Sequence, residues 1–385
     1  MAQVDARRYG TAVDVISWRE GGRDHRVRWR SESGAPPPGR VVVAGDETRA
    51  DDAYRLACEG TALLWRGDFQ NARQLLAAMA RRIDRPPRRR RKKPEPSQVQ
   101  AFHLYRQSRA QRARTLGMVL IPFDPGHVIP LRRAPDVQDA CTEAHGPDDQ
   151  PYVTSLRELL GLIGAHEWRE KGVGIPALGG DRIHPHYGVF SPVRGEYVDL
   201  VGEAPLPATS TAFDVGTGTG VLAAVLARRG IGRVVATDQD PRALACAREN
   251  LDRLKVDVRV VQADLFPDGR AGLIVCNPPW VPAKPSSPLE HAVYDPGSRM
   301  LRGFLSGLAE HLEPGGEGWL ILSDLAEHLG LRTRDDLLAL FEASGLKVAG
   351  RLDTRPRHLR ATDPDDPLHA ARTAETTSLW RLTSR

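Results

Sequence analysis

The sequence predicts an open, doubly wound α/β sheet over residues 206–385, preceded by a basic α/β or α+β extension. From Ala212 onward, continuous apolar runs alternate with helical stretches, and such runs are typical of parallel strands that are covered on both faces. The length of 385 residues also exceeds what one hydrophobic core usually supports. We therefore expect at least two domains.

The C-terminal sheet is expected to have five strands with helices between them, because the apolar runs are separated by segments with helical spacing. Two last runs follow without a helix between them and are expected to close the sheet antiparallel. The expected strands are 212–216, 233–238, 258–263, 272–277 and 318–323, the helices are 220–229, 241–254, 298–313 and 334–344, and the closing strands are 346–352 and 376–383.

The N-terminal part shows fewer elements, and these suggest a small α/β or α+β domain. Helical spacing at 99–116 comes with arginines that would form a cationic face, and 134–151 is expected to be a loop. The expected strands here are 41–46 and 62–68, the helices are 70–84, 99–116 and 155–168, and the arginines are Arg106, Arg109, Arg112 and Arg114.

The net charge of +5 comes from one segment. Residues 81–93 contain nine basic residues and one acidic residue, so the chain would be slightly acidic without them. The part from Pro86 to Pro96 consists of proline and charged residues, and we expect a basic, proline-rich linker or loop over 81–98. Codon bias is an alternative cause, because the chain has 48 Arg and only 6 Lys. The candidates for contacts with nucleic-acid phosphates are Arg88, Arg89, Arg90, Arg91, Lys92 and Lys93.

The composition excludes several classes of protein. Hydrophobic residues at 41% and charged residues at 27% argue against a disordered, collagenous or membrane-embedded chain. The charged N-terminus lacks the apolar stretch of a signal peptide, and the four cysteines are too scattered for a metal motif or a disulfide framework. We expect a cytoplasmic protein without a metal, in which His184 and His186 are loop residues rather than a metal pair.

The turn after the first strand of the C-terminal sheet carries an acidic residue and three glycines. It reads Asp214-Val215-Gly216-Thr217-Gly218-Thr219-Gly220, and a glycine-rich turn from strand to helix lets a ligand approach the backbone. A dinucleotide fingerprint needs G-x-G-x-x-G, and Asp214 would repel a pyrophosphate. S-adenosyl-L-methionine (AdoMet) has no phosphate and carries a cationic sulfonium and an ammonium. The turn therefore favours AdoMet, the alternative being a plain tight turn.

Two further acidic residues follow the next strands. Asp238 ends the second strand, and a carboxylate there can accept both ribose hydroxyls of an adenosine. The alternative role is a helix cap, which we assign to Asp240, ahead of Pro241. Asp264 ends the third strand, where its carboxylate or the nearby backbone can meet the adenine amino group. Their neighbours Gln239 and Leu265, together with Asn277 after the fourth strand, complete the expected cofactor contacts.

The fourth strand ends in Asn277-Pro278-Pro279-Trp280, which offers groups for binding a planar nitrogen. The Asn277 side-chain oxygen and the Pro278 carbonyl are two acceptors, and the prolines fix the turn. Together they can bind the two N–H bonds of an amine or amide and direct its lone pair at a sulfonium methyl. Trp280 can stack on a planar target, and in-line displacement needs positioning more than a strong base. The alternative is a structural Pro-Pro turn.

With these motifs, residues 190–325 resemble the class I AdoMet-dependent methyltransferases, in the branch with an Asn-Pro-Pro-aromatic motif known as the methyltransferase small domain. The branch includes ribosomal RNA base and protein glutamine N-methyltransferases. The resemblance implies a Rossmann-like sheet in which Asp238 binds ribose, Asp264 lies near adenine and Asn277–Trp280 hold the target. The methionine end of AdoMet would lie against Asp214, Gly216, Thr217, Gly218 and Gly220.

The resemblance also covers the segment upstream of the sheet. Phe190 and Pro192, in the run Tyr187–Pro192, are similar to the segment that folds over AdoMet in this group. Well-known members carry Tyr or Phe where this chain has Trp280, so we expect a target pocket of different shape. His291, in the loop after Trp280, is either a proton acceptor or a residue of a lid.

We therefore expect an N-methyltransferase that acts on an exocyclic amine of an RNA base, above all a ribosomal one. The alternatives are a protein glutamine N-methyltransferase acting on a release factor or ribosomal protein, a small-molecule methyltransferase, and a non-catalytic nucleic-acid-binding module. The expected partners are RNA or a ribosome-associated protein, and no membrane. Residues 1–150 would recognise the substrate, 151–205 would form a helical connector that covers the cofactor, and 206–385 would be catalytic.

Overall fold

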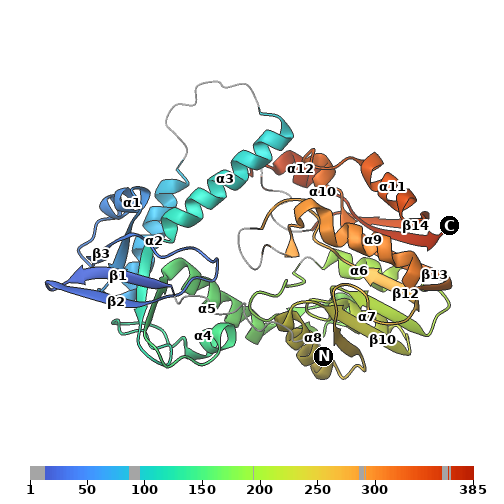
Figure 1. Cartoon of the computed structure of the whole chain (residues 1–385), viewed down its shortest axis with the longest axis horizontal. Helices are drawn as coiled ribbons and strands as arrows, with labels where there is room; N and C mark the ends of the chain where they lie inside the picture. The colour runs from blue at the N-terminus through green and yellow to red at the C-terminus, as the bar shows by residue number, and fades with distance from the viewer. Residues whose placement is uncertain are drawn as a thin grey trace, which may run out of the picture. The chain divides into compact units, whose positions relative to one another are not determined.

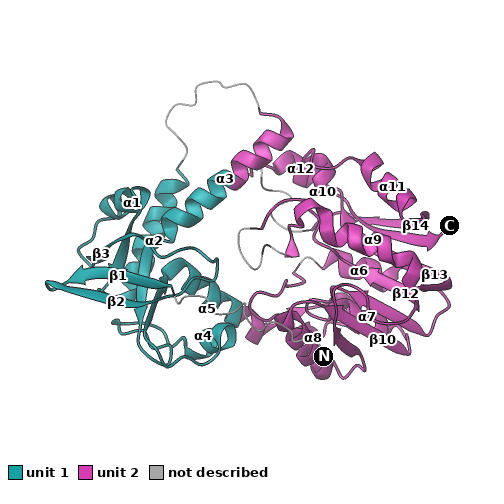
Figure 2. Ribbon diagram, viewed as in Figure 1, with its two compact units in different colours: residues 1–93, 107–166 teal, residues 94–106, 167–385 magenta. Residues whose placement is uncertain are grey.

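The computed structural model describes residues 14–85, 96–193, 195–285, 290, 292–357, 363 and 366–385. The chain divides into two compact units (Figures 1 and 2): unit 1 is Met1–Lys93 with Gln107–His166, and unit 2 is Pro94–Arg106 with Glu167–Arg385. These bounds differ from the divisions at residues 150 and 205 that the sequence predicts. Within the described ranges, no helix combines the length and the apolar character that crossing a bilayer requires.

Unit 2 contains a seven-stranded sheet with the order β11-β10-β9-β12-β13-β15-β14. Strands β9 to β13 run parallel, and β15 is antiparallel to β13 and β14, so the doubly wound sheet and its antiparallel closure are confirmed. The strand order reverses between β9 and β12, the point where such sheets bind ligands. The strands are β9 (Thr211–Val215), β10 (Arg233–Asp238), β11 (Arg259–Gln262), β12 (Ala271–Cys276), β13 (Leu312–Ser323), β14 (Leu346–Thr354) and β15 (Thr377–Ser384).

Helices cover both faces of this sheet, because each face carries its own buried apolar cluster. One cluster joins the sheet to α6, α7 and α8, and the other joins it to α9 and α11. β12 is buried at every position, which explains its uninterrupted apolar run. The helices are α6 (Glu196–Glu203), α7 (Val221–Arg228), α8 (Pro241–Leu254), α9 (Arg299–His311), α10 (Leu325–His328), α11 (Arg334–Ala343) and α12 (His369–Ala374), and the short elements are β7 (Val173–Gly174), η1 (Pro176–Leu178), β8 (Arg182–Ile183) and η3 (Pro296–Ser298).

Unit 1 contains a mixed six-stranded sheet with the order β1-β2-β6-β5-β4-β3. The sequence analysis predicted β3, β4, α2 and α5, and it missed the β1–β2 hairpin, α1, β5 and β6. Its loop over 134–151 was wrong, because α4 lies there. The elements are β1 (Val15–Glu20), β2 (Arg23–Trp29), β3 (Arg40–Ala44), α1 (Ala50–Cys58), β4 (Thr61–Trp65), α2 (Phe69–Ile83), β5 (Val119–Phe123), α4 (Gln138–His145), β6 (Tyr152–Ser155) and α5 (Leu156–Lys171), whose residues from Glu167 onward belong to unit 2.

Helix α3 (Gln98–Leu116) contributes residues to both units, and its arginines do not form the free cationic face that we expected. In unit 1, Arg112 Nε and Nη2 donate to the Asp84 carboxylate at 2.8 and 2.9 Å. In unit 2, Arg106 Nη2 donates to the Lys284 carbonyl at 2.6 Å. Arg114 Nη2 also donates to Gln111 Oε1, so three of the four arginines are engaged within the protein.

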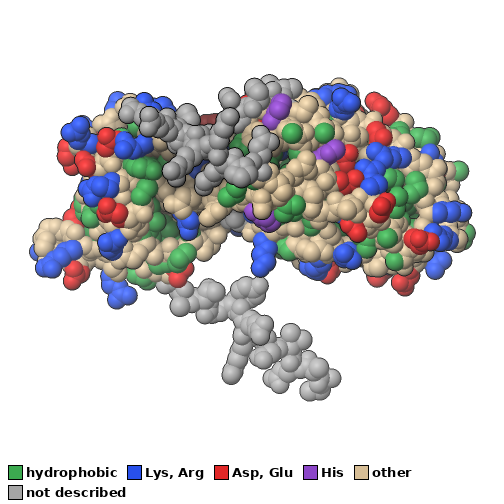
Figure 3. Space-filling view, turned by 90° about the horizontal axis from the view of Figure 1, so that it is seen from above, with side chains coloured by type: hydrophobic (Ala, Val, Ile, Leu, Met, Phe, Trp, Pro, Cys, Tyr) green, Lys and Arg blue, Asp and Glu red, His purple; other side chains and the backbone are tan. Residues whose placement is uncertain are grey.

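Charges of both signs are intermingled on the described surface that Figure 3 shows. This agrees with the sequence, in which the basic excess lies in residues 81–93. The candidates Arg88 to Lys93 lie outside the described residues, so the expected nucleic-acid contacts of this tract stay a prediction.

A two-point ion pair joins β13 to β15. Arg381 Nε and Nη2 donate to Glu317 Oε2 and Oε1 at 2.8 and 2.6 Å, and the two side chains are 24% and 11% exposed. The Arg381 hydrogen bonds lower the pKa of Glu317. A partly buried pair with this geometry leaves a costly charge behind when one partner is removed.

We predict that Arg381→Met lowers the free energy of unfolding by roughly 2 kcal/mol at pH 7, because Glu317 then stays charged without its partner. Since the folded-state pKa of Glu317 is depressed, the contribution of the pair is present at neutral pH and is lost as pH falls through that pKa. Urea unfolding at pH 7 and pH 3 measures this. The double variant Glu317→Leu/Arg381→Met should recover most of the loss, and an unchanged midpoint in the single variant would contradict the prediction.

Candidate active site

The predicted site residues of unit 2 lie at the carboxyl edge of its sheet. Asp214 lies near the end of β9, Asp238 ends β10, and Asn277 directly follows β12. Because β9 lies between β10 and β12 and all three run parallel, these residues come from neighbouring strand ends. The sheet therefore brings together groups that are far apart in the sequence.

The glycine loop is held on the end of β10. The N–H groups of Gly216 and Thr217 donate to the Thr237 carbonyl at 2.9 and 2.8 Å. Gly216 has a φ of +73°, and a Cβ there would lie 2.4 Å from Met300 Cε. Gly220, with a φ of +81°, forms the N-cap of α7. Both glycines are therefore required by the backbone conformation of the loop.

Asp214 is buried beneath this loop and shapes it. Its Oδ2 accepts from the Thr217 hydroxyl at 2.6 Å and from the Ala223 N–H at 3.0 Å. Burial raises the pKa of Asp214 to about 6, although these two hydrogen bonds oppose the rise. The carboxylate thus connects β9 with both the loop and the first turn of α7.

Asp240, and not Asp238, caps α8, as the sequence predicts. Asp240 caps α8 by accepting from the Arg242 N–H at 2.9 Å. Asp238 Oδ2 accepts from the Gly218 N–H at 3.1 Å, and its Oδ1 accepts from the Asp240 N–H at 3.0 Å. Burial raises the pKa of Asp238. The loop and the start of α8 therefore fix the orientation of its carboxylate.

The expected adenine contacts lie at a more open part of the edge. Asp264 pairs with Arg299 at 2.9 Å, and both side chains are mostly exposed, so the pair adds little stability. Leu265 has a φ of +82°, and its carbonyl accepts from the Thr237 hydroxyl. Gln239 is exposed. Thr237 thus links the glycine loop to the segment after β11.

The Asn-Pro-Pro-Trp motif contains a hydrogen bond that the sequence analysis did not foresee. The indole N–H of Trp280 donates to Asn277 Oδ1 at 2.9 Å. Trp280 is partly buried and packs against three apolar clusters. The bond fixes which end of the Asn277 amide faces the indole, and it leaves the second lone pair of Oδ1 for another donor.

The segment that carries Phe190 and Pro192 packs on α8 through its upstream part. The His184 N–H donates to Asn250 Oδ1 at 2.7 Å, and the buried Asn250 donates in turn to the Thr219 carbonyl of the glycine loop at 3.1 Å. Asn250, which the sequence analysis missed, therefore connects this segment to the loop. Phe190 is half-buried and Pro192 is buried.

The two histidines of this segment bond to different groups. His184 Nδ1 lies 2.6 Å from the Arg169 carbonyl, and His186 Nε2 lies 2.7 Å from Glu249 Oε2. The Glu249 pKa is lowered to about 2 by its partners Arg253 and His186 among others, against the opposing effect of burial. One nitrogen of each imidazole ring therefore has a hydrogen-bond partner within unit 2.

A second buried carboxylate, Glu196, was also missed. Glu196 is the first residue of α6 and is 4% exposed, and its buried Oε1 has no hydrogen-bond partner. Arg229, at the end of α7, donates to the carbonyls of Val201 and Ala204 at 2.6 Å each. This joins the C-terminal ends of α6 and α7, which pack side by side. Glu196 therefore lies toward the end where the glycine loop enters α7, and only its position on a short helix could have signalled it.

The loop after Trp280 ends in another well-bonded carboxylate. Asp295 accepts from the N–H groups of Arg299, Met300 and Leu301 at 2.8, 2.9 and 3.3 Å. Its role in the structure is to hold the first turn of α9. His291 lies outside the described residues.

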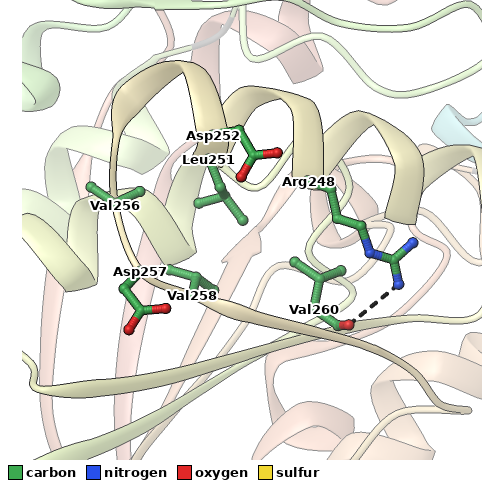
Figure 4. A pocket seen from close by; sticks show the side chains of 7 residues that line it. All are labelled: Arg248, Leu251, Asp252, Val256, Asp257, Val258 and Val260. Carbon is green, nitrogen blue, oxygen red and sulfur yellow. Dashed lines mark hydrogen bonds between the residues drawn. The ribbon is translucent and has the colours of Figure 1, made fainter.

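A surface pocket in unit 2 is separate from this site. It lies between the C-terminal part of α8 and the start of β11, and Arg248 donates to the Val260 carbonyl at 3.3 Å beside it (Figure 4). The predicted site residues follow the carboxyl ends of the strands, so this pocket at the beginning of β11 lies away from them. It is lined by Arg248, Leu251, Asp252, Val256, Asp257, Val258 and Val260.

Comparisons with known proteins identify the family of this chain. Residues 182–342 match the family model described as methyltransferase small domain. A release factor glutamine methyltransferase of Cereibacter sphaeroides is 31% identical over 256 residues, which cover 61% of this chain and 89% of that protein. The chain belongs to the class I AdoMet-dependent methyltransferases. It is an enzyme whose cofactor is AdoMet, as the sequence analysis predicted.

Other proteins are similar to a smaller part of this chain, and some of these alignments also cover only part of the other protein. A release factor glutamine methyltransferase of Mycolicibacterium smegmatis is 35% identical over 167 residues, 40% of this chain and 59% of that protein. A ribosomal protein L11 methyltransferase of Pelotomaculum thermopropionicum is 52% identical over 71 residues, 17% of this chain and 23% of that protein. A solved methyltransferase from Pyrococcus furiosus aligns with 60% of this chain and 98% of its own, at 18% identity and a TM-score of 0.38.

The residues of the methyltransferase site suit the cationic cofactor. Burial raises the pKa values of Asp214 and Asp238, so each carboxylate gains when a positive charge replaces the water that it has lost. Glu196 Oε1 is a buried acceptor without a partner, and unsatisfied buried acceptors are costly until a donor meets them. The ammonium and the sulfonium of AdoMet would supply positive charge beside these buried carboxylates.

We predict that Asp238→Ala weakens AdoMet binding about 10- to 100-fold, the effect of losing roughly 1.5 to 3 kcal/mol of charge-assisted hydrogen bonding. Isothermal titration calorimetry measures it. Asp240→Ala is the matched control, because it removes a helix cap worth about 1 kcal/mol of stability and should leave the affinity unchanged. Equal affinities of the Asp238→Ala variant and the native chain would contradict the assignment.

We predict that Asp214 makes the free energy of unfolding depend on pH. Its folded-state pKa is raised to about 6 from 3.8, so its contribution to stability is full below pH 4 and is lost as pH rises through 6. Relative to Asp214→Asn, the native chain should lose roughly 2.5 kcal/mol between pH 4 and pH 7. AdoMet favours the ionised form, so its effect on Tm should be larger at pH 7 than at pH 5. Parallel pH profiles of the two proteins in thermal unfolding would refute this.

Proposed function

We propose that this methyltransferase methylates the nitrogen of a planar carboxamide, the glutamine side chain of a protein of the translation machinery. The observation that carries the proposal is Asn277, whose side-chain oxygen stands at the end of β12, held by Trp280. A neighbouring strand end carries Asp238, which would bind the ribose of the cofactor. Acceptors for a target nitrogen and a carboxylate for the cofactor thus come from the same edge of one sheet.

Asn277 and Pro278 prepare the nitrogen for attack. A carboxamide nitrogen is a poor nucleophile because its lone pair is conjugated with the carbonyl. Asn277 Oδ1 accepts one of its N–H bonds through the remaining lone pair, and the Pro278 carbonyl accepts the other. Holding both N–H bonds turns the nitrogen lone pair out of conjugation and toward the methyl group. AdoMet, when bound, would supply that methyl group from its sulfonium and leave as S-adenosylhomocysteine, and the nitrogen would release one proton to solvent.

Trp280 has two tasks in this arrangement. Its N–H keeps the oxygen of the Asn277 amide in place, since a flipped amide would turn its NH₂ group toward the indole N–H. Its ring offers a flat apolar surface for a planar amide. The two functions together position the acceptor, and in-line methyl transfer gains most from positioning.

The carboxylates of the edge serve the cofactor side. We propose that Asp214 and the loop residues Gly216, Thr217, Gly218 and Gly220 surround its methionine end, with Asp264, Leu265 and Gln239 near its adenosine. Phe190 and Pro192 would cover it. Because Thr217 already donates to Asp214, its contribution is to orient that carboxylate.

The choice of a glutamine target is supported by the extent of similarity to release factor glutamine methyltransferases. The alignment with the Cereibacter sphaeroides protein spans 256 residues and so extends beyond the segment 182–342 of the family model. An RNA base amine would use the same two acceptors. That second candidate is favoured by the basic residues 81–93, which would add affinity for phosphates.

One experiment separates these targets. The protein is incubated with methyl-labelled AdoMet and a cell lysate freed of small molecules, and the product is then treated with protease or ribonuclease. We expect the label to be released by protease, resist ribonuclease and be recovered as N-methylglutamine. Release by ribonuclease would replace the protein target with RNA, and absence of label from both fractions would refute a macromolecular target.

We predict that Asn277→Ala reduces methyl transfer at least 100-fold while the Kd for AdoMet stays within about threefold, because the side chain acts on the target nitrogen. Trp280→Phe keeps a flat ring but removes the N–H donor, and we expect a smaller loss, about tenfold. Calorimetry and transfer rates are measured on the same preparations. If Asn277→Ala lost AdoMet affinity as severely as activity, Asn277 would be a structural residue.

A further inference from the structure

The loop that follows the Asn-Pro-Pro-Trp motif is braced by a segment from far upstream. Residues 98–106 of α3 belong to unit 2. Phe102, 2% exposed, packs in an apolar cluster with Val281, and Trp280 packs against the same cluster. The other buried members are Leu325, Leu329, Leu368 and Ala371. Part of α3 therefore forms the wall behind the motif.

Arg106 makes the polar contacts of this brace. Its Nη2 donates to the Lys284 carbonyl at 2.6 Å and lies 3.4 Å from Glu290 Oε2. Its guanidinium carbon is 4.2 Å from the centre of the Tyr294 ring, a distance at which cation–π attraction is favourable. The side chain is 21% exposed. One residue thus contacts both the early and the late part of the loop.

The two ends of the loop are also joined to each other. The Val281 N–H donates to the Val293 carbonyl at 3.1 Å, and the Asp295 N–H donates to the Val281 carbonyl at 2.9 Å. Val281 directly follows Trp280, and Tyr294 directly precedes Asp295, which holds the first turn of α9. A residue that fixes Tyr294 and Lys284 therefore restrains the backbone that leads out of Trp280.

We propose that Arg106 is a positioning residue for methyl transfer, which keeps Trp280 and through it Asn277 in place by clamping the loop after the motif. The inference rests on the proposed function of Asn277 as the acceptor of the target nitrogen. It adds a residue from outside the segment 182–342 that matches the family model. The acceptor side of the site is then completed by α3, whereas the cofactor side is formed by the sheet and its loops.

Arg112 provides a matched control on the same helix, since it forms a two-point ion pair with Asp84 inside unit 1. The variants are Arg106→Leu, Arg106→Lys and Arg112→Leu, all made in the full chain. Amide hydrogen exchange at Val281 and Asp295 reports the restraint of the loop. Calorimetry measures AdoMet affinity, and methyl-labelled AdoMet with a cell lysate measures transfer.

We expect Arg106→Leu to speed exchange at Val281 and Asp295 about tenfold and to reduce methyl transfer by a similar factor. The AdoMet Kd should stay within about threefold, and the Tm should match that of Arg112→Leu. Arg106→Lys should recover part of the transfer, because it restores a donor for the Lys284 carbonyl but not the planar group over Tyr294. Arg112→Leu should change neither exchange at these amides nor transfer.

Three results would overturn the proposal: unchanged exchange at Val281 and Asp295 in Arg106→Leu, unchanged transfer despite faster exchange, or equal effects in Arg112→Leu. Loss of AdoMet affinity together with transfer would also overturn it, because the residue would then act on the fold of the whole site. A native chain that shows no transfer to any macromolecule contradicts the proposed function instead, and the exchange data alone then decide whether Arg106 clamps the loop.

Discussion

The catalytic unit depends on the burial of one carboxylate. Asp214 is 1% exposed, and removing a carboxylate from water is costly unless hydrogen bonds compensate. The two bonds that compensate come from Thr217, at the start of the glycine loop, and from Ala223, in α7. They set the course of the loop between them, and with it the Gly218 N–H that meets Asp238. Under the proposed function, the cationic cofactor would also stabilise this buried carboxylate, so the same residue would shape the loop and favour binding of the cofactor.

Charge is distributed unequally over the carboxyl edge of the sheet. The ends of β9 and β10 carry acidic side chains, whereas the end of β12 carries an amide, two prolines and an indole. The acidic strand ends suit the cationic sulfonium of AdoMet. Under the proposed function, the neutral groups after β12 would accept the N–H bonds of the target, and methyl transfer would then require acceptors at fixed places rather than a strong base in the motif.

Much of this unit could be predicted from the sequence, because strand ends, glycines and acidic residues each leave a local signal. The seven strands of the large sheet of unit 2 and the cap at Asp240 were predicted in this way. The Trp280–Asn277 hydrogen bond could not be found, since it depends on the rotamer of an indole. Glu196 and Asn250 escaped because each looks like an ordinary helix residue until packing removes it from water. In unit 1, the strand Arg23–Trp29 is dominated by charged side chains, so it has no apolar alternation to detect. Helix α4 buries only the small side chains of Ala140, Cys141 and Ala144, so it has no large apolar residues at helical spacing to detect.

The division of α3 between the units limits how the chain can be dissected. A fragment that begins at Glu167 retains every motif residue and the whole parallel sheet, yet it lacks Phe102 and exposes the apolar side chains of Val281, Leu325 and Leu329 to water. A fragment that begins at Gln98 keeps that wall, but it strips Arg112 of Asp84 and separates the strands of the first sheet. No single cut releases a catalytic unit with an intact surface. Each large sheet of the enzyme therefore belongs to one unit, whereas the chain cannot be cut cleanly between the units. A fragment whose boundaries are chosen from sequence motifs alone would expose apolar side chains and tend to aggregate.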